Sequence, residues 1–86
     1  MTDARVCDLV VPCRDEARAL PQALAHVPER FSVIVVDNGS RDGTAEVARR
    51  LGAHVVHEAV AGYGAAVDAG VRASSAPYVA VMDGDG

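Results

Sequence analysis

The segment Val33-Ile34-Val35-Val36-Asp37-Asn38-Gly39-Ser40 passes directly from four apolar β-branched residues into a polar turn. A run that is apolar at every position, without alternation, is typical of a strand covered on both faces. Leu9-Val10-Val11, just before Pro12, has the same character. Strands of this kind belong to parallel sheets, because the connecting helices lie on both faces of such sheets. The two runs therefore indicate an α/β domain.

Outward from these runs, the chain alternates between expected strands and expected helices. We expect strands at residues 6–12, 31–37, 54–57 and 78–83. Apolar or small residues with helical spacing lie between them: Leu20, Leu24 and Val27; Val47, Ala48 and Leu51; Val67, Gly70, Val71 and Ser74. The resulting β-α-β-α-β-α-β chain predicts a Rossmann-like parallel sheet. With right-handed crossovers the strand order is 3-2-1-4, and ligands are expected at the carboxyl ends of the strands beside the first strand.

The composition excludes several classes of protein. Among 86 residues there is no lysine, and all eight basic residues are arginine. A P-loop, a protein-kinase site and a Schiff-base enzyme each require a lysine, so none can be built from this chain. Twelve acidic residues give a net charge of −4, and only three residues are aromatic. We therefore expect no nucleic-acid partner.

The cysteines and the hydropathy bear on the cellular location. Cys7 and Cys13 lie six positions apart, which is about 20 Å in an extended strand and too far for a disulfide. Two unpaired thiols suit a reducing compartment, so a cytoplasmic protein is predicted. No secretory signal is expected, and no apolar run approaches the ~20 residues of a membrane span.

Acidic and other polar residues follow three of the expected strands, at residues 12–16, 37–44 and 83–86. In the expected sheet these segments meet at one edge, with Asp37 and Asp83 about 10 Å apart. Acidic groups that face one cleft repel each other unless a cation or several hydrogen-bond donors lie between them. This edge is therefore the predicted functional site.

Asp83-Gly84-Asp85 is the candidate metal motif. Two carboxylates separated by one glycine offer hard oxygen ligands that suit Mg²⁺ or Mn²⁺. Gly84 would leave room for a diphosphate, and the metal would act on the leaving group as a Lewis acid. Taken alone, the same three residues are more typical of a turn.

Three other features allow both a structural and a functional interpretation. Asp37 can accept a hydrogen bond within the turn that follows its strand, or bind a base N–H or a ribose hydroxyl. Gly62-Tyr63-Gly64 can be a plain loop, or a helix N-terminus whose bare backbone approaches a phosphate. His54 and His57 flank a short strand and are interpreted as structural.

Together these motifs resemble the N-terminal part of family 2 glycosyltransferases with the GT-A fold. The resemblance rests on residues 10–16, 35–44, 62–66 with Gly70, and 81–86, in that order and at these spacings. The Gly-Tyr-Gly-Ala-Ala run and the Asp-Gly-Asp-Gly ending look most similar to the branch that uses polyprenyl or dolichyl phosphates as acceptors. This chain departs from the family pattern at two positions. Many members carry Asn at the position of Asp15, and many carry Asp at the position of Asn38.

The resemblance implies roles for particular residues. The implied nucleotide contacts are Pro12, Arg14, Glu16, Asp37 and Asp83, and the implied metal ligands are Asp83 and Asp85. The implied activity is transfer of a sugar from a UDP- or GDP-sugar to an acceptor, such as a polyprenyl phosphate, with Mg²⁺ or Mn²⁺ as cofactor.

The chain length sets a second expectation. We expect residues 1–86 to be a single partial domain, the nucleotide-sugar-binding half, cut after the Asp-Xaa-Asp motif, with no catalytic base in it. One alternative is a non-catalytic remnant that binds a nucleotide weakly or not at all. A phosphohydrolase is a more distant one, because its Asp-Xaa-Asp pair would follow the first strand rather than the fourth.

Overall fold

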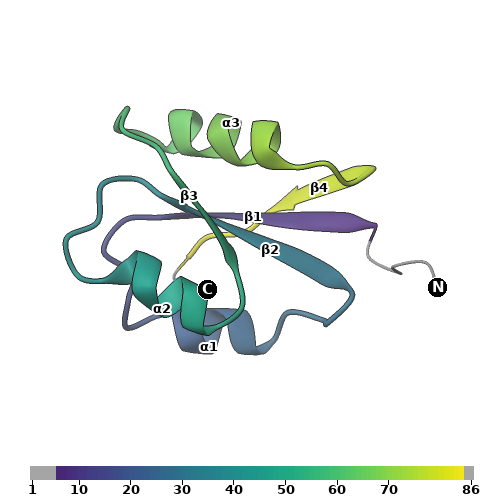
Figure 1. Ribbon diagram of the computed structural model, residues 1–86, viewed down its shortest axis with the longest axis horizontal. Coiled ribbons are helices and arrows are strands. Elements are labelled where there is room, and N and C mark those ends of the chain that lie inside the picture. The colour runs from purple at the N-terminus through teal and green to yellow at the C-terminus, as the bar shows by residue number, and fades with distance from the viewer. Residues whose placement is uncertain (1–5, 85–86) are drawn as a thin grey trace.

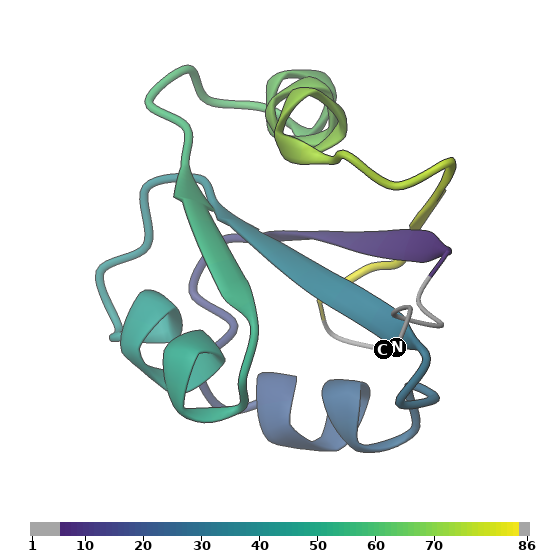
Figure 2. The same cartoon turned by 45° about the vertical axis from the view of Figure 1, so that its right-hand side comes forward.

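Four parallel strands form one sheet in the order β3-β2-β1-β4 in the computed structural model, which describes residues 6–84. The strands are β1 (Cys7–Cys13), β2 (Phe31–Asp37), β3 (His54–His57) and β4 (Tyr78–Val81), and the helices are α1 (Leu20–Ala25), α2 (Thr44–Arg50) and α3 (Tyr63–Ala73). Helix α3 covers one face of the sheet, and α1 and α2 cover the other (Figures 1 and 2). The predicted fold class and strand order are confirmed.

The core is divided between the two faces of the sheet. Val10 and Val11 are adjacent in β1 and both are fully buried, because successive side chains of a strand point to opposite faces. On the α3 side, Val10 packs with Ile34, Val36 and Ala66, whereas on the other side Val11 packs with Leu9, Cys13, Leu20, Val35 and Ala48. This double coverage explains why the β1 and β2 segments are apolar without alternation.

Helix α3 lies close to the sheet because its buried face is made of small residues. An added Cβ at Gly70 would lie 2.3 Å from Cγ1 of Val10 and 3.0 Å from Cγ2 of Val36. The prediction of which α3 residues face the sheet was wrong at one position. Ala66 and Gly70 are buried whereas Val71 is exposed, since the close approach leaves no room for a valine against β1.

Two strand boundaries also differ from expectation. Strand β1 covers Cys7–Cys13 rather than 6–12, and β4 ends at Val81 rather than at Asp83. The N–H of Met82 still donates to the carbonyl of Val10 at 3.0 Å. The next donor toward β4 would be the backbone nitrogen of Pro12, which carries no hydrogen, so the pairing stops there.

Helix α2 ends at a glycine in the left-handed region. Gly52, with φ of 89°, follows the C-cap residue Leu51, a position where glycine is common. Leu51, which was expected in the core, is 42% exposed because it lies past the last turn of α2. Within residues 6–84, no helix has the length and apolar character needed to cross a bilayer.

Candidate functional site

A small pocket lies at the carboxyl ends of β1 and β2, beside the beginning of α3. Its volume is about 230 Å³. It is lined by Pro12, Cys13, Arg14, Asn38, Gly62, Tyr63 and Ala66. The sequence predicted Pro12 and Arg14 at this site, whereas Asn38 and Tyr63 were not among the predicted site residues. The parallel register, which pairs Cys13 with Asp37, brings these segments to one edge.

The other predicted site residues surround this pocket without lining it. Asp37 is buried at the end of β2, Glu16 is half-buried in the loop after β1, and Asp83 is exposed after β4. Asp85 lies outside the described residues. The first two polar segments and Gly84 of the third therefore lie together at the carboxyl edge, but only the first contributes predicted residues to the pocket wall.

Hydrogen bonds join the loop after β1 to the loop after β2, in an arrangement that we term the interloop clamp (residues 15–17 with residues 40–44). The N–H of Asp15 donates to Oγ of Ser40 at 2.9 Å, and the N–H of Arg41 donates to Oδ1 of Asp15 at 2.8 Å. The N–H of Glu16 donates to Oγ1 of Thr44 at 3.0 Å. Each loop thus supplies acceptors for the backbone of the other.

Asp42 completes the clamp at the start of α2. Its Oδ2 accepts from the N–H of Ala17 at 3.1 Å, and its Oδ1 accepts from the N–H of Thr44 at 3.1 Å and from the Thr44 hydroxyl. The Thr44 hydroxyl bond, followed by the two backbone bonds, lowers the pKa of Asp42. Asp15 and Asp42 therefore have hydrogen-bond donors as partners, which offsets much of the acidic repulsion expected at this edge.

The backbone of Asp15 explains why this position accepts Asp. Its φ is 55°, in the left-handed region, where Asp and Asn are tolerated better than other side chains. The bond from Arg41 requires only an oxygen acceptor at the end of a short side chain, and both Asp and Asn have one. The departure from the family pattern at Asp15 thus leaves the clamp intact.

Asp37 has the turn role that was one of its two interpretations. Its Oδ1 accepts from the N–H of Ser40 at 3.0 Å. Its Oδ2 lies 3.6 Å from Nδ1 of His57, whose Nε2 is 3.4 Å from Nη2 of Arg49. His57 therefore borders the site, which its interpretation as structural did not anticipate. The expected pairing of the two strands could have indicated this contact, since Asp37 and His57 end adjacent strands.

The backbone at the start of α3 is partly occupied by the protein itself. Gly62 has φ of 123° and ψ of 151°, a conformation that residues other than glycine rarely adopt. Its N–H donates to Oδ1 of Asn38 at 3.0 Å. A phosphate at this helix N-terminus would therefore meet the N–H groups that follow Gly62 rather than that of Gly62.

Gly84 packs against the end of β1. An added Cβ would lie 2.7 Å from Sγ of Cys13, 3.2 Å from the carbonyl oxygen of Pro12 and 3.3 Å from Cγ of Glu16. The absence of a side chain at Gly84 thus serves this contact within the chain, and room for a diphosphate beside it stays a prediction. Burial, with the nearby charges of Glu16, Asp37 and Asp42, raises the pKa of Cys13 to about 12.

The metal motif can be tested only in part. Asp83 offers one exposed carboxylate of the hard type that Mg²⁺ and Mn²⁺ prefer. Within residues 6–84, no three His, Cys, Asp or Glu side chains come together as a metal site. The second expected ligand, Asp85, is outside that range.

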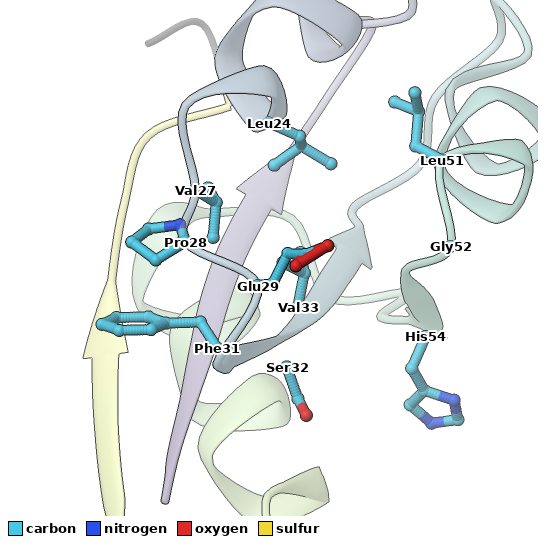
Figure 3. A pocket seen from close by; sticks show the side chains of 10 residues that line it. All are labelled: Leu24, Val27, Pro28, Glu29, Phe31, Ser32, Val33, Leu51, Gly52 and His54. Carbon is cyan, nitrogen blue, oxygen red and sulfur yellow. The ribbon is translucent and has the colours of Figure 1, made fainter. Parts of the chain in front are cut away.

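A larger hollow of about 590 Å³ lies at the opposite edge of the sheet. Figure 3 shows its lining, which mixes apolar and polar side chains and comes from α1 and the loop after it, the start of β2 and the segment from α2 into β3. The residues are Leu24, Val27, Pro28, Glu29, Phe31, Ser32, Val33, Leu51, Gly52 and His54. None of the predicted site residues lies there, so the smaller pocket is the candidate site.

A sheet of order 3-2-1-4 with a pocket at its carboxyl edge defines a Rossmann-like α/β domain. The profile of "Glycosyl transferase family 2" matches residues 8–86, and the chain belongs to this family. An uncharacterized glycosyltransferase of Mycobacterium tuberculosis is 53% identical over 78 residues, which are 91% of this chain and 36% of that protein. A dolichyl-phosphate hexose transferase of Haloferax volcanii is 38% identical over 91 residues, covering 99% of this chain and 40% of that protein.

Solved structures agree with this assignment. Glucosyl-3-phosphoglycerate synthase of Mycobacterium tuberculosis, in complex with Mn²⁺, UDP and glucosyl-3-phosphoglycerate, superposes with a TM-score of 0.80 at 26% identity. The match covers 93% of this chain and 33% of that one. A mannosyltransferase of Pyrobaculum calidifontis, in complex with GDP-Man and Mn²⁺, has a TM-score of 0.81 at 26% identity, covering 93% of this chain and 27% of that one. The GT-A fold is thus confirmed for this chain, which corresponds to the N-terminal third of such proteins.

Proposed function

We propose that this chain forms the donor-binding part of an inverting glycosyltransferase that uses a UDP- or GDP-sugar. The observation that carries the proposal is the pocket at the carboxyl ends of β1 and β2, with Pro12 and Arg14 in its wall and Asp37 beside it. Relatives of the same fold were solved with UDP or with GDP-Man, each together with Mn²⁺. The chain spans about a third of the length of the relatives it matches, so the complete reaction is part of the proposal.

The proposed nucleotide contacts are Pro12, Arg14, Glu16, Asp37 and Asp83. Arg14 is exposed at the pocket, where its guanidinium would pair with a phosphate through charge-assisted hydrogen bonds. Oδ1 of Asp37 accepts from the N–H of Ser40, so a base N–H or a ribose hydroxyl would bind Oδ2, which it would share with Nδ1 of His57 at 3.6 Å. Because the chain has no lysine, its strongly cationic donors to phosphate are arginines.

Asp83 and Asp85 are the proposed ligands of Mg²⁺ or Mn²⁺. When bound, the metal would neutralise charge on the leaving diphosphate as a Lewis acid. The proposed acceptor is a polyprenyl phosphate, which the similarity to the dolichyl-phosphate hexose transferase supports. Both thiols, Cys7 and Cys13, are free, which supports the proposed cytoplasmic location.

Calorimetric titration of the 86-residue chain with UDP-glucose and GDP-mannose, with and without Mn²⁺, tests the proposal. We expect binding of one donor, strengthened by Mn²⁺ and weakened about tenfold or more by Arg14→Ala or Asp37→Asn. Arg50→Ala is the matched control, because this exposed arginine lies in the last turn of α2. If neither donor binds, the proposal fails in favour of the non-catalytic alternative.

A further inference from the structure

We infer that Asn38 is a positioning residue that holds the pocket wall formed by Gly62 and Tyr63, and that it must be an amide to do so. The inference rests on the proposed function, because the wall matters only if the pocket binds a nucleotide. Asn38 is 8% exposed and is among the few buried polar residues described in this chain. Its side chain does not point to solvent but into the segment between β3 and α3.

Three hydrogen bonds tie Asn38 to that segment. Its Nδ2 donates to the carbonyl oxygen of Glu58 at 2.9 Å and to that of Val60 at 2.8 Å. Its Oδ1 accepts from the N–H of Gly62 at 3.0 Å. Both N–H donors of the amide are used, and the orientation is determined by the partners, since two carbonyls must face the NH₂ group and an N–H must face the oxygen.

These bonds control where the pocket wall lies. The segment 58–62 contains no helix or strand, and Val60 within it and Tyr63 just after it are 64% and 60% exposed, so little apolar packing holds it. Asn38 itself is fixed, because its own N–H donates to the carbonyl of Cys13 at 2.9 Å. The side chain of Asn38 therefore fixes Gly62 and the start of α3 relative to the carboxyl ends of β1 and β2.

An aspartate at position 38 could not replace this amide. An ionised carboxylate is an acceptor only, so it would face the carbonyl oxygens of Glu58 and Val60 with no donor between them. In this chain, loss of the two donors would populate open forms of the wall, which lowers apparent affinity by the fraction that remains closed.

The first test measures amide hydrogen exchange in the 86-residue chain, comparing wild type with Asn38→Asp and Asn38→Ser. Exchange at Gly62 should rise about tenfold or more in both variants, while exchange at Ala48 in α2 changes little. Gln22→Glu, an equal change of amide to acid on the exposed face of α1, should leave Gly62 unchanged. Unchanged exchange at Gly62, or an equal rise at Ala48, would overturn the local role.

The second test titrates the same variants with UDP and with GDP in the presence of Mn²⁺. Affinity should fall about tenfold or more in both Asn38 variants and remain at the wild-type value in Gln22→Glu. A loss in Asn38→Asp without a loss in Asn38→Ser would assign the effect to charge and overturn the inference. If the wild type binds neither nucleotide, the proposed function fails, whereas the exchange at Gly62 still decides whether Asn38 holds the segment.

Discussion

The N–H of Asp15 donates to Oγ of Ser40 at 2.9 Å, across two loops whose residues lie 25 positions apart. The residue after Ser40 returns a bond, since the N–H of Arg41 donates to Oδ1 of Asp15. These contacts show that the polar residues after β2 build the edge of the site by holding the loop after β1. Arg14 and Glu16, two proposed nucleotide contacts, lie on the loop that is held in this way.

Thr44→Val should destabilise the protein by about 1–3 kcal/mol, because it leaves the N–H of Glu16 without its acceptor at a fully buried position. Thr44→Ser keeps the hydroxyl and loses only a methyl group, so its effect should be smaller. The measurement is the midpoint of urea unfolding followed by circular dichroism. Equal midpoints for the two variants would show that the hydroxyl bonds contribute no more stability than the methyl group.

Acid should weaken the clamp through Asp42. Because the folded state lowers the pKa of Asp42, its contribution to stability is fully present above the ordinary value of 3.8 and is lost as the pH falls through the lower folded value. The stability advantage of the wild type over Asp42→Asn should therefore shrink as the pH falls below 3.8. Urea unfolding between pH 6 and pH 2 measures this difference.

A matched carboxylate provides the control for this experiment. Asp68 is exposed on α3 and pairs with its own helix neighbour Arg72, at 2.8 Å. Asp68→Asn should have a smaller effect on stability at pH 6 than Asp42→Asn, because an exposed pair contributes little. A constant difference between wild type and Asp42→Asn across the acid range would contradict the proposed linkage.

Gly70→Ala should destabilise the fold by about 1–2 kcal/mol, because overpacking against Val10 outweighs the helix propensity that alanine adds. Gly64→Ala is the matched control in the same helix, since no atom lies within 4 Å of its added Cβ. That variant should be neutral or stabilising by up to about 1 kcal/mol. Chemical denaturation of both variants checks the prediction, and a Gly70→Ala protein as stable as Gly64→Ala would disprove the close packing of α3.

The two thiols should differ in reactivity. Cys13 is 3% exposed and its pKa is raised to about 12, mainly by burial, so at pH 8 it should resist a thiol reagent in the native protein. Cys7 is only partly buried and should react faster. Single-thiol variants, Cys7→Ser and Cys13→Ser, allow each rate to be measured with and without urea. Rapid native labelling of Cys13 would mean that the contact with Gly84 opens readily.

The linkage for Cys13 also has a definite sign. Because its pKa is raised in the folded state, the stability associated with the neutral thiol is present below the ordinary value of 9.0 and declines as the pH rises toward about 12. The urea midpoint of the wild type should therefore fall between these values more steeply than that of Cys13→Ser. Parallel declines would contradict a buried neutral thiol.

The order of strands and helices followed from the sequence alone, because it depends on local patterns. Val33–Val36 and Leu9–Val11 are apolar at every position, and such runs require cover on both faces whatever the details of packing. The right-handed crossover then leaves few ways to arrange four parallel strands. The edge of the sheet that carries the site followed for the same reason.

The partners of the polar side chains were decided only by the tertiary structure. Asn38 and Asp42 each have several possible partners in sequence, and the distances that select among them depend on how two loops and a helix are placed around the sheet. The same is true of Gly84, whose lack of a side chain accommodates Sγ of Cys13. Patterns along the chain specify which faces are buried, whereas a hydrogen bond requires two distant atoms within about 3 Å, and only the folded chain brings them there.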